Sequence, residues 1–138
     1  MNLSNWFLRI AVLYLIAGVG LGIFMGASGD HSMFPLHAHI NLLGWVSMVL
    51  FGLFYRLWPQ AALSKLAKLH FWLYMPSVLA QMALLAALFR GHPEVEPALG
   101  VASTLVAAAM VCFAVVVWKE TSSSGARSAQ LKESHAAA

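Results

Sequence analysis

The chain has 138 residues, of which 61% are hydrophobic and only 9% are charged. A soluble domain carries about 25% charged residues, so this composition is typical of an integral membrane protein. The only cysteine, Cys112, excludes a disulfide framework and a zinc site built from cysteines. A net charge of +3 could indicate nucleic-acid binding, but the distribution of the charges indicates a different cause.

Four apolar runs predict four membrane-spanning helices, at about residues 6–26, 36–57, 69–89 and 97–118. Each is close to the roughly 20 residues that cross the hydrocarbon core. The first run also resembles a signal peptide, and we expect it to be retained as a span. The predicted fold class is therefore all-α, an integral membrane four-helix bundle that occupies residues 1–118. Residues 119–138 are polar and rich in Ser and Ala, so we expect a disordered tail.

The positive charges predict the orientation of these spans. Only one basic residue, Arg90, falls on the side of the first and third loops, beside Asp30, Glu94 and Glu96. The other basic residues all fall on the opposite side; they are Arg9, Arg56, Lys65, Lys68, Lys119, Arg127 and Lys132. The positive-inside rule places both termini, the second loop and the tail in the cytoplasm. We therefore expect a multi-pass protein of a bacterial-type inner membrane, surrounded by the lipid bilayer and without a nucleic-acid partner.

Two histidines, His37 and His39, stand in the first turn of the second predicted span. Imidazoles within a span are costly and usually functional. Residues two apart on a helix point about 200° from each other, so these two rings cannot easily hold one metal from a single helix. This geometry indicates two separate centres, or one centre shared between helices or subunits. The alternative is that both histidines are interfacial and bond to water, lipid head groups or Asn41.

A stripe of small and polar residues continues below His37 on the same predicted helix. Its members are Asn41, Gly44, Met48, Gly52 and Tyr55. Glycines on the stripe leave room for a large flat group or for a second backbone. Asn41, Gly44 and Met48 are therefore candidate cofactor-binding residues.

Other polar groups are secondary candidates. His31 and His92 fall in the outer loops, where a copper site with Met33 is chemically reasonable. His70 begins the third span on the cytoplasmic side, too far from His37 for pairing within one chain, and we expect it to be interfacial. Gly18, Gly22 and Gly26 predict close helix packing, and Gln81 is expected to bond across helices.

The second span resembles the histidine-bearing helices of the heme-copper oxidase catalytic subunit, the family of the cytochrome oxidases and nitric oxide reductases. In that family a late helix opens with His-x-His, runs from outside to inside, and ends with a glycine and an aromatic-proline pair. Similar spacings occur here in His37-Ala38-His39, Gly52 and Trp58-Pro59. The stretch Pro35-Leu36-His37 also resembles the family's early helix, which carries a single heme ligand. The family subunit has twelve helices in three arcs, and this chain has the size of one arc.

The resemblance implies a heme protein. Three copies would rebuild the twelve-helix ring, with His37 of one copy and His39 of the next as iron ligands. Heme b is expected, since no Cys-x-x-Cys-His motif is present. Iron held by two imidazoles is low-spin and suits electron transfer. No second histidine-bearing helix resembles the family's copper ligands, so whether the chain is an enzyme stays open.

Two alternatives belong to other functional classes. In the first, the chain would be a copper-binding or oxidase-assembly membrane protein. In the second, it would be an accessory subunit that packs against a larger oxidase. In the last case the histidines would be only interfacial.

Overall fold

The computed structural model describes the backbone of residues 2–136 and the side chains of residues 2–122, and every regular element in this part is helical. In chain order the elements are α1 (Leu3–Ser28), α2 (Phe34–His39), η1 (Ile40–Ser47), α3 (Met48–Leu57), α4 (Pro59–Leu63), α5 (Lys65–Leu88), η2 (Pro93–Val95) and α6 (Glu96–Ala136). Here η1 is a π-helix and η2 is a 3₁₀-helix. The predicted all-α class is confirmed.

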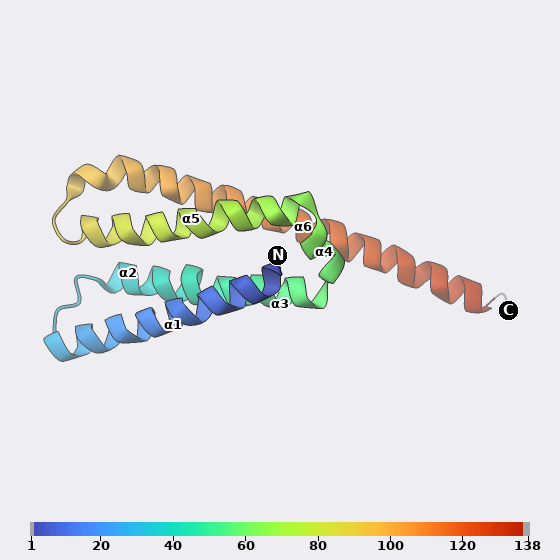
Figure 1. Ribbon diagram of the computed structural model, residues 1–138, viewed down its shortest axis with the longest axis horizontal. Helices are drawn as coiled ribbons and strands as arrows, with labels where there is room; N and C mark the ends of the chain where they lie inside the picture. Colours follow the sequence, from blue (N-terminus) through green and yellow to red (C-terminus); the bar gives the residue numbers. More distant parts are fainter. Residues whose placement is uncertain (1, 137–138) are drawn as a thin grey trace.

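The helices form two antiparallel hairpins (Figure 1). In the first, α1 lies beside the continuous span α2–η1–α3, and in the second α5 lies beside α6. One end of the molecule carries the N-terminus and the short helix α4, and we refer to it as the α4 end. The opposite end carries the connections 29–33 and 89–95, and we refer to it as the two-loop end.

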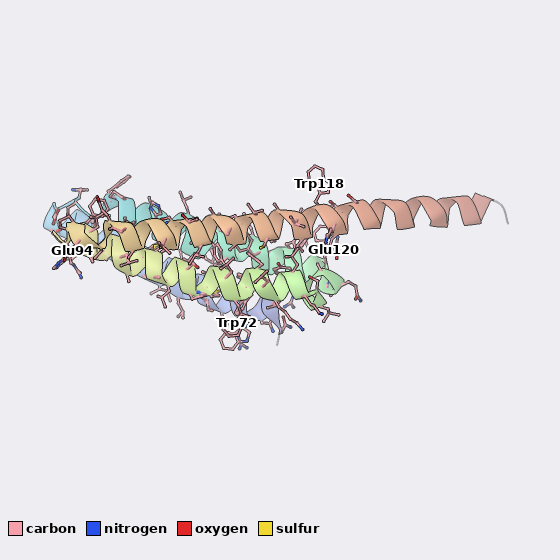
Figure 2. All side chains as sticks on the ribbon, turned by 90° about the horizontal axis from the view of Figure 1, so that it is seen from above. Trp72, Glu94, Trp118 and Glu120 are labelled. Atoms are coloured by element: carbon pink, nitrogen blue, oxygen red, sulfur yellow. The ribbon has the colours of Figure 1, made fainter. Side chains whose placement is uncertain are left out.

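Four helical segments are long and apolar enough to cross a membrane: Leu3–Ser28, Phe34–Leu57, Lys65–Leu88 and Pro93–Ser122. This confirms the four predicted spans, although each begins two to four residues earlier than the apolar runs suggest. Large apolar side chains face outward along them, such as Leu13 at 65% exposed and Ile23 at 67%. Trp72 and Trp118 project from opposite sides of the bundle (Figure 2). Which end faces the cytoplasm stays a prediction.

Local signals explain where the helices begin and end. The Asn2 side chain accepts the Asn5 N–H at 3.2 Å and caps α1, and Ser64 accepts the Ala67 N–H at 3.0 Å to cap α5. At the end of α1, Gly29 has a φ of 72°, a conformation that glycine adopts without strain. Its N–H donates to the Met25 carbonyl at 3.0 Å, which closes the helix.

The second span is not the regular α-helix that the sequence predicts. Residues Ile40–Ser47 form a π-helix between two α-helical parts. Two hydroxyls bond carbonyl groups of this segment: Ser47 Oγ donates to Leu42 O at 2.8 Å, and Tyr74 Oη donates to Leu43 O at 3.0 Å. Both hydroxyls thus donate to carbonyls of the wider turn. Such π-segments are frequent at functional sites.

An aromatic cluster joins the two hairpins in the half of the bundle nearer the α4 end. Phe7 of α1 is fully buried and is its centre. The Phe7 ring lies 5.1–5.9 Å, between centroids, from the rings of Phe51, Tyr55, His70 and Phe71. Offset and edge-to-face rings at these separations attract each other beyond their area of burial.

The last helix runs past the rest of the bundle (Figure 1). The predicted disordered tail, residues 119–138, falls mostly within α6, which continues to Ala136. Strong helix formers such as Ala129, Gln130, Leu131, Lys132 and Glu133 account for a helical backbone there. Residues 137 and 138 lie outside the described part.

Candidate functional site

The side chain of His39 is held in one orientation by its own helix. His39 Nδ1 lies 2.8 Å from the carbonyl oxygen of Pro35, one turn earlier. A carbonyl only accepts hydrogen bonds, so Nδ1 must carry the proton and Nε2 carries the free lone pair. His39 is half-buried, and its Nε2 is the nitrogen left available to a metal. Metal-binding histidines are typically oriented in this way, by a bond from the other ring N–H to a carbonyl or carboxylate.

His37 lies in the seam between α2 and α1. A Cβ added to Gly22 of α1 would lie 3.0 Å from His37 Cε1, so the ring packs directly against this glycine. Asn41 covers the ring edge: its Nδ2 is 3.3 Å from His37 Nε2, 3.5 Å from Nδ1, and donates to the His37 carbonyl at 2.9 Å. The contact between His37 and Asn41, which the interfacial alternative expects, is therefore present.

Gly18 and Gly22 make room for this seam. A Cβ on Gly18 would come within 2.6 Å of Asn41 Oδ1, so only glycine lets the amide lie there. By contrast, nothing lies within 4 Å of a Cβ built on Gly26. Two of the three regularly spaced glycines thus serve close helix packing, as predicted, and the third does not.

The two histidines lie on different flanks of the helix. Because Phe34–His39 is α-helical, residues two apart differ in direction by about 200°. The His37 flank packs against α1, so His39 lies on the flank turned away from Gly22. Among the residues that the structure describes, no group of three His, Cys, Asp or Glu side chains is placed to hold a metal ion.

The lower members of the predicted stripe are packed inside this chain. The space beside Gly44 is filled by the ring of Tyr14 from α1, and that beside Gly52 by Leu8. Met48 is fully buried in the core. The sequence left two possibilities for the space beside these glycines, a large flat group or a second backbone. In this chain the helix α1 fills the space beside Gly44 and Gly52. The role of Gly44 and Met48 in binding a cofactor stays a prediction.

The loop histidines make only local bonds. His31 Nδ1 lies 2.9 Å from Gly29 O, and His92 Nδ1 lies 2.9 Å from Glu94 Oε1. In the same loop as His31, the Asp30 carboxylate accepts the Ser32 N–H at 2.9 Å. This backbone bond holds the pKa of Asp30 below its ordinary value. The predicted copper site at this surface stays a prediction.

His70 is the clearest departure from expectation. It is 0% exposed and lies in the aromatic cluster, whereas the sequence predicts an interfacial residue. Tyr55 Oη lies 3.0 Å from His70 Nδ1, but His70 Nε2 is buried and has no hydrogen-bond partner among the residues that the structure describes. The apolar run that begins at residue 69 does not reveal this burial, because α5 begins one turn earlier, at Lys65, and the depth of His70 in the membrane stays a prediction.

A polar cavity at the α4 end is a further feature that the sequence does not predict. Its volume is about 660 Å³, and it is lined by Asn2, Leu3, Ser4, Asn5, Tyr55, Arg56, Pro59, Ala62 and Leu63. These residues come from three elements and are far apart in the chain, so no local motif reveals the cavity.

Comparison of this chain with known proteins finds no matching family model, no matching curated protein and no matching solved structure.

Proposed function

We propose that the protein is a membrane cytochrome that binds heme b near the two-loop end, with His39 as an iron ligand. The observation that carries this proposal is the bond between His39 Nδ1 and the Pro35 carbonyl, which leaves Nε2 as the free nitrogen. A ring fixed in this way loses little conformational freedom on binding iron. The apolar residues on the exposed face of the same span, Phe34 and Leu42, supply a surface that suits a porphyrin edge.

The second ligand comes from another copy of the chain. Within one chain the two imidazoles lie on different flanks, so a site shared between protomers is the arrangement that uses both. In this arrangement His37 of a neighbouring copy would be the second residue that holds the iron, and a trimer matches the resemblance to the twelve-helix family. Coordination by His37 requires the Asn41 amide to turn away from the ring edge that it covers.

The role of the bound group is electron transfer. When bound, heme held by two imidazoles would supply single-electron transfer. The residues of this chain orient the ligands: the Pro35 carbonyl fixes His39, and the glycines of α1 position His37. Hydrogen bonding to the ligating rings tunes the basicity of the ligands.

The test is an optical spectrum of the full chain purified from heme-replete cells, together with its mass in detergent. We expect a Soret band, sharp reduced bands and an oligomer. His39→Ala and His37→Ala should each abolish the low-spin spectrum, whereas the loop variants His31→Ala and His92→Ala should retain it.

Three results would overturn the proposal. A colourless preparation would exclude a cytochrome, and copper without heme would favour the metal-handling alternative. An unchanged spectrum in His37→Ala would exclude the shared two-histidine site, even if His39→Ala lost the heme.

A further inference from the structure

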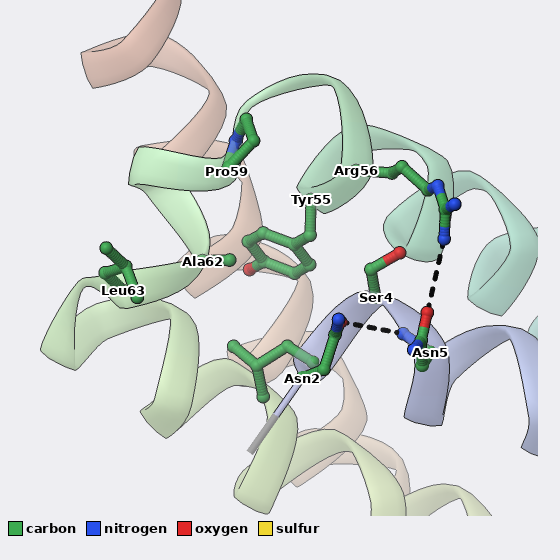
Figure 3. A pocket seen from close by; sticks show the side chains of 9 residues that line it. Asn2, Ser4, Asn5, Tyr55, Arg56, Pro59, Ala62 and Leu63 are labelled. Carbon is green, nitrogen blue, oxygen red and sulfur yellow. Dashed lines mark hydrogen bonds between the residues drawn. The ribbon is translucent and has the colours of Figure 1, made fainter.

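The cavity at the α4 end has the chemistry of an anion site. Arg56 lines it, and no acidic residue is among the lining residues. The guanidinium donates to Asn5 Oδ1 at 3.3 Å (Figure 3), which leaves most of its N–H donors free for a ligand.

The first turn of α1 contributes a second source of positive potential. Leu3 and Ser4 are the first two residues of this 26-residue helix and both line the cavity. Their backbone N–H groups precede the first intrahelical bond, which Trp6 N donates to Asn2 O at 3.2 Å. Free N–H groups and the helix dipole favour an anion at such an end.

A buried hydroxyl without a partner points independently to a ligand. Ser4 is only 4% exposed, and within the described part of the chain its Oγ has no hydrogen-bond partner. Figure 3 shows this hydroxyl between the ring of Tyr55 and the side chain of Arg56. A buried hydroxyl that lacks a hydrogen bond destabilises a protein, so a ligand oxygen that accepts from Ser4 would remove this cost.

We propose that this cavity binds the phosphodiester head group of an anionic phospholipid. Phosphate oxygens would accept from Arg56, from the Ser4 hydroxyl and from the N–H groups of α1. The position favours a lipid over a free phosphate, because the cavity lies at the end of the spans and exposed apolar residues occur at the same end of the fold. Among these are Leu57 at 70% exposed and Leu63 at 69%, along which acyl chains can lie. Basic pockets between transmembrane helices bind lipid head groups by the same chemistry.

The experiment measures binding to the full chain in a non-ionic detergent, from the rise of its thermal unfolding midpoint with ligand concentration. The probes are a short-chain phosphatidylglycerol, a short-chain phosphatidylcholine and inorganic phosphate. We expect phosphatidylglycerol to stabilise the protein at the lowest concentration. Loss of a charge-assisted bond in Arg56→Gln should weaken its apparent affinity about tenfold or more. Arg90→Gln, which removes a positive charge at the two-loop end, is the matched control and should not change it.

Ser4→Ala separates ligand binding from a structural role. Because the Ser4 hydroxyl has no partner in residues 2–122, whose side chains the structure describes, this variant should unfold without lipid at a midpoint equal to or higher than that of the unmodified chain. Its affinity for phosphatidylglycerol should nevertheless fall. Equal stabilisation by inorganic phosphate would overturn the lipid assignment. Equal effects of the two lipids, or unchanged affinity in both Arg56→Gln and Ser4→Ala, would overturn the site itself.

Discussion

The hydrogen bond between Tyr55 and His70 should couple the two residues energetically. Tyr55→Phe removes only the hydroxyl, and it leaves both nitrogens of a fully buried imidazole without a partner. The bond is 3.0 Å long and joins α3 to α5, so its loss acts on the contact between the two hairpins.

The expected coupling energy between Tyr55 and His70 follows from two opposing effects. An unsatisfied buried group costs about 1–3 kcal/mol in water-soluble proteins. Hydrogen bonds between membrane helices average about 0.6 kcal/mol and reach about 1.7 kcal/mol, because the unfolded chain finds other partners in the membrane. His70 has no exposed surface in the fold, so we expect a value in the upper part of the membrane range, about 1 kcal/mol.

The assay is a double-mutant cycle with Tyr55→Phe, His70→Leu and the double variant, unfolded by titration with sodium dodecyl sulfate and followed by circular dichroism. The double variant should be less destabilised than the sum of the two single variants by about 1 kcal/mol, because neither partner is then left unpaired. Tyr14→Phe combined with His70→Leu is the control, since Tyr14 packs against Gly44 instead. Additive effects in the Tyr55 cycle would refute the coupling.

Two further predictions concern the helix seam and the two-loop end. Gly44→Ala should destabilise the fold by about 1–3 kcal/mol, because the added methyl meets the ring of Tyr14. Gly20→Ala is the control and should not destabilise the fold, because nothing lies within 4 Å of a Cβ at that position. Equal effects of the two variants in the same denaturant titration would contradict the close packing at Gly44. Asp30 should titrate below its ordinary pKa in an NMR titration, since its carboxylate accepts the Ser32 N–H. The contribution of the Asp30 carboxylate to stability should therefore be complete at pH values above the ordinary pKa of Asp, and it should disappear as the pH falls through the lowered pKa. An unshifted pKa would show that the bond to the Ser32 N–H is not formed.

The four spans were predictable because an uninterrupted apolar run of sufficient length can be satisfied in a membrane only as a helix. The pair His37–Asn41 was also predictable, since residues four apart meet on one helix face. The link from Gln81 to another helix is likewise confirmed, because its Nε2 donates to Ser103 Oγ of α6 at 2.9 Å.

Other features depend on contacts between distant parts of the chain. Tyr74 lies 31 residues from the carbonyl that it bonds in η1, so the sequence of the second span alone could not reveal the π-helix. The burial of His70 likewise depends on Phe7 and Phe51, which reach it from α1 and α3, so the sequence around His70 alone does not reveal it.

The π-helix determines how side chains before and after it are rotated about the axis of the second span. The histidines precede Ile40–Ser47 and the aromatic cluster residues Phe51 and Tyr55 follow it, so this segment sets the angle between them. Deleting one residue there would rotate everything beyond it by about 100°. The span would keep its apolar composition after such a deletion, but Phe51 and Tyr55 would turn away from the residues that they now contact on α1 and α5. The π-helix thus fixes the angle between the histidine-bearing start of the second span and the part of the span that packs in the aromatic cluster.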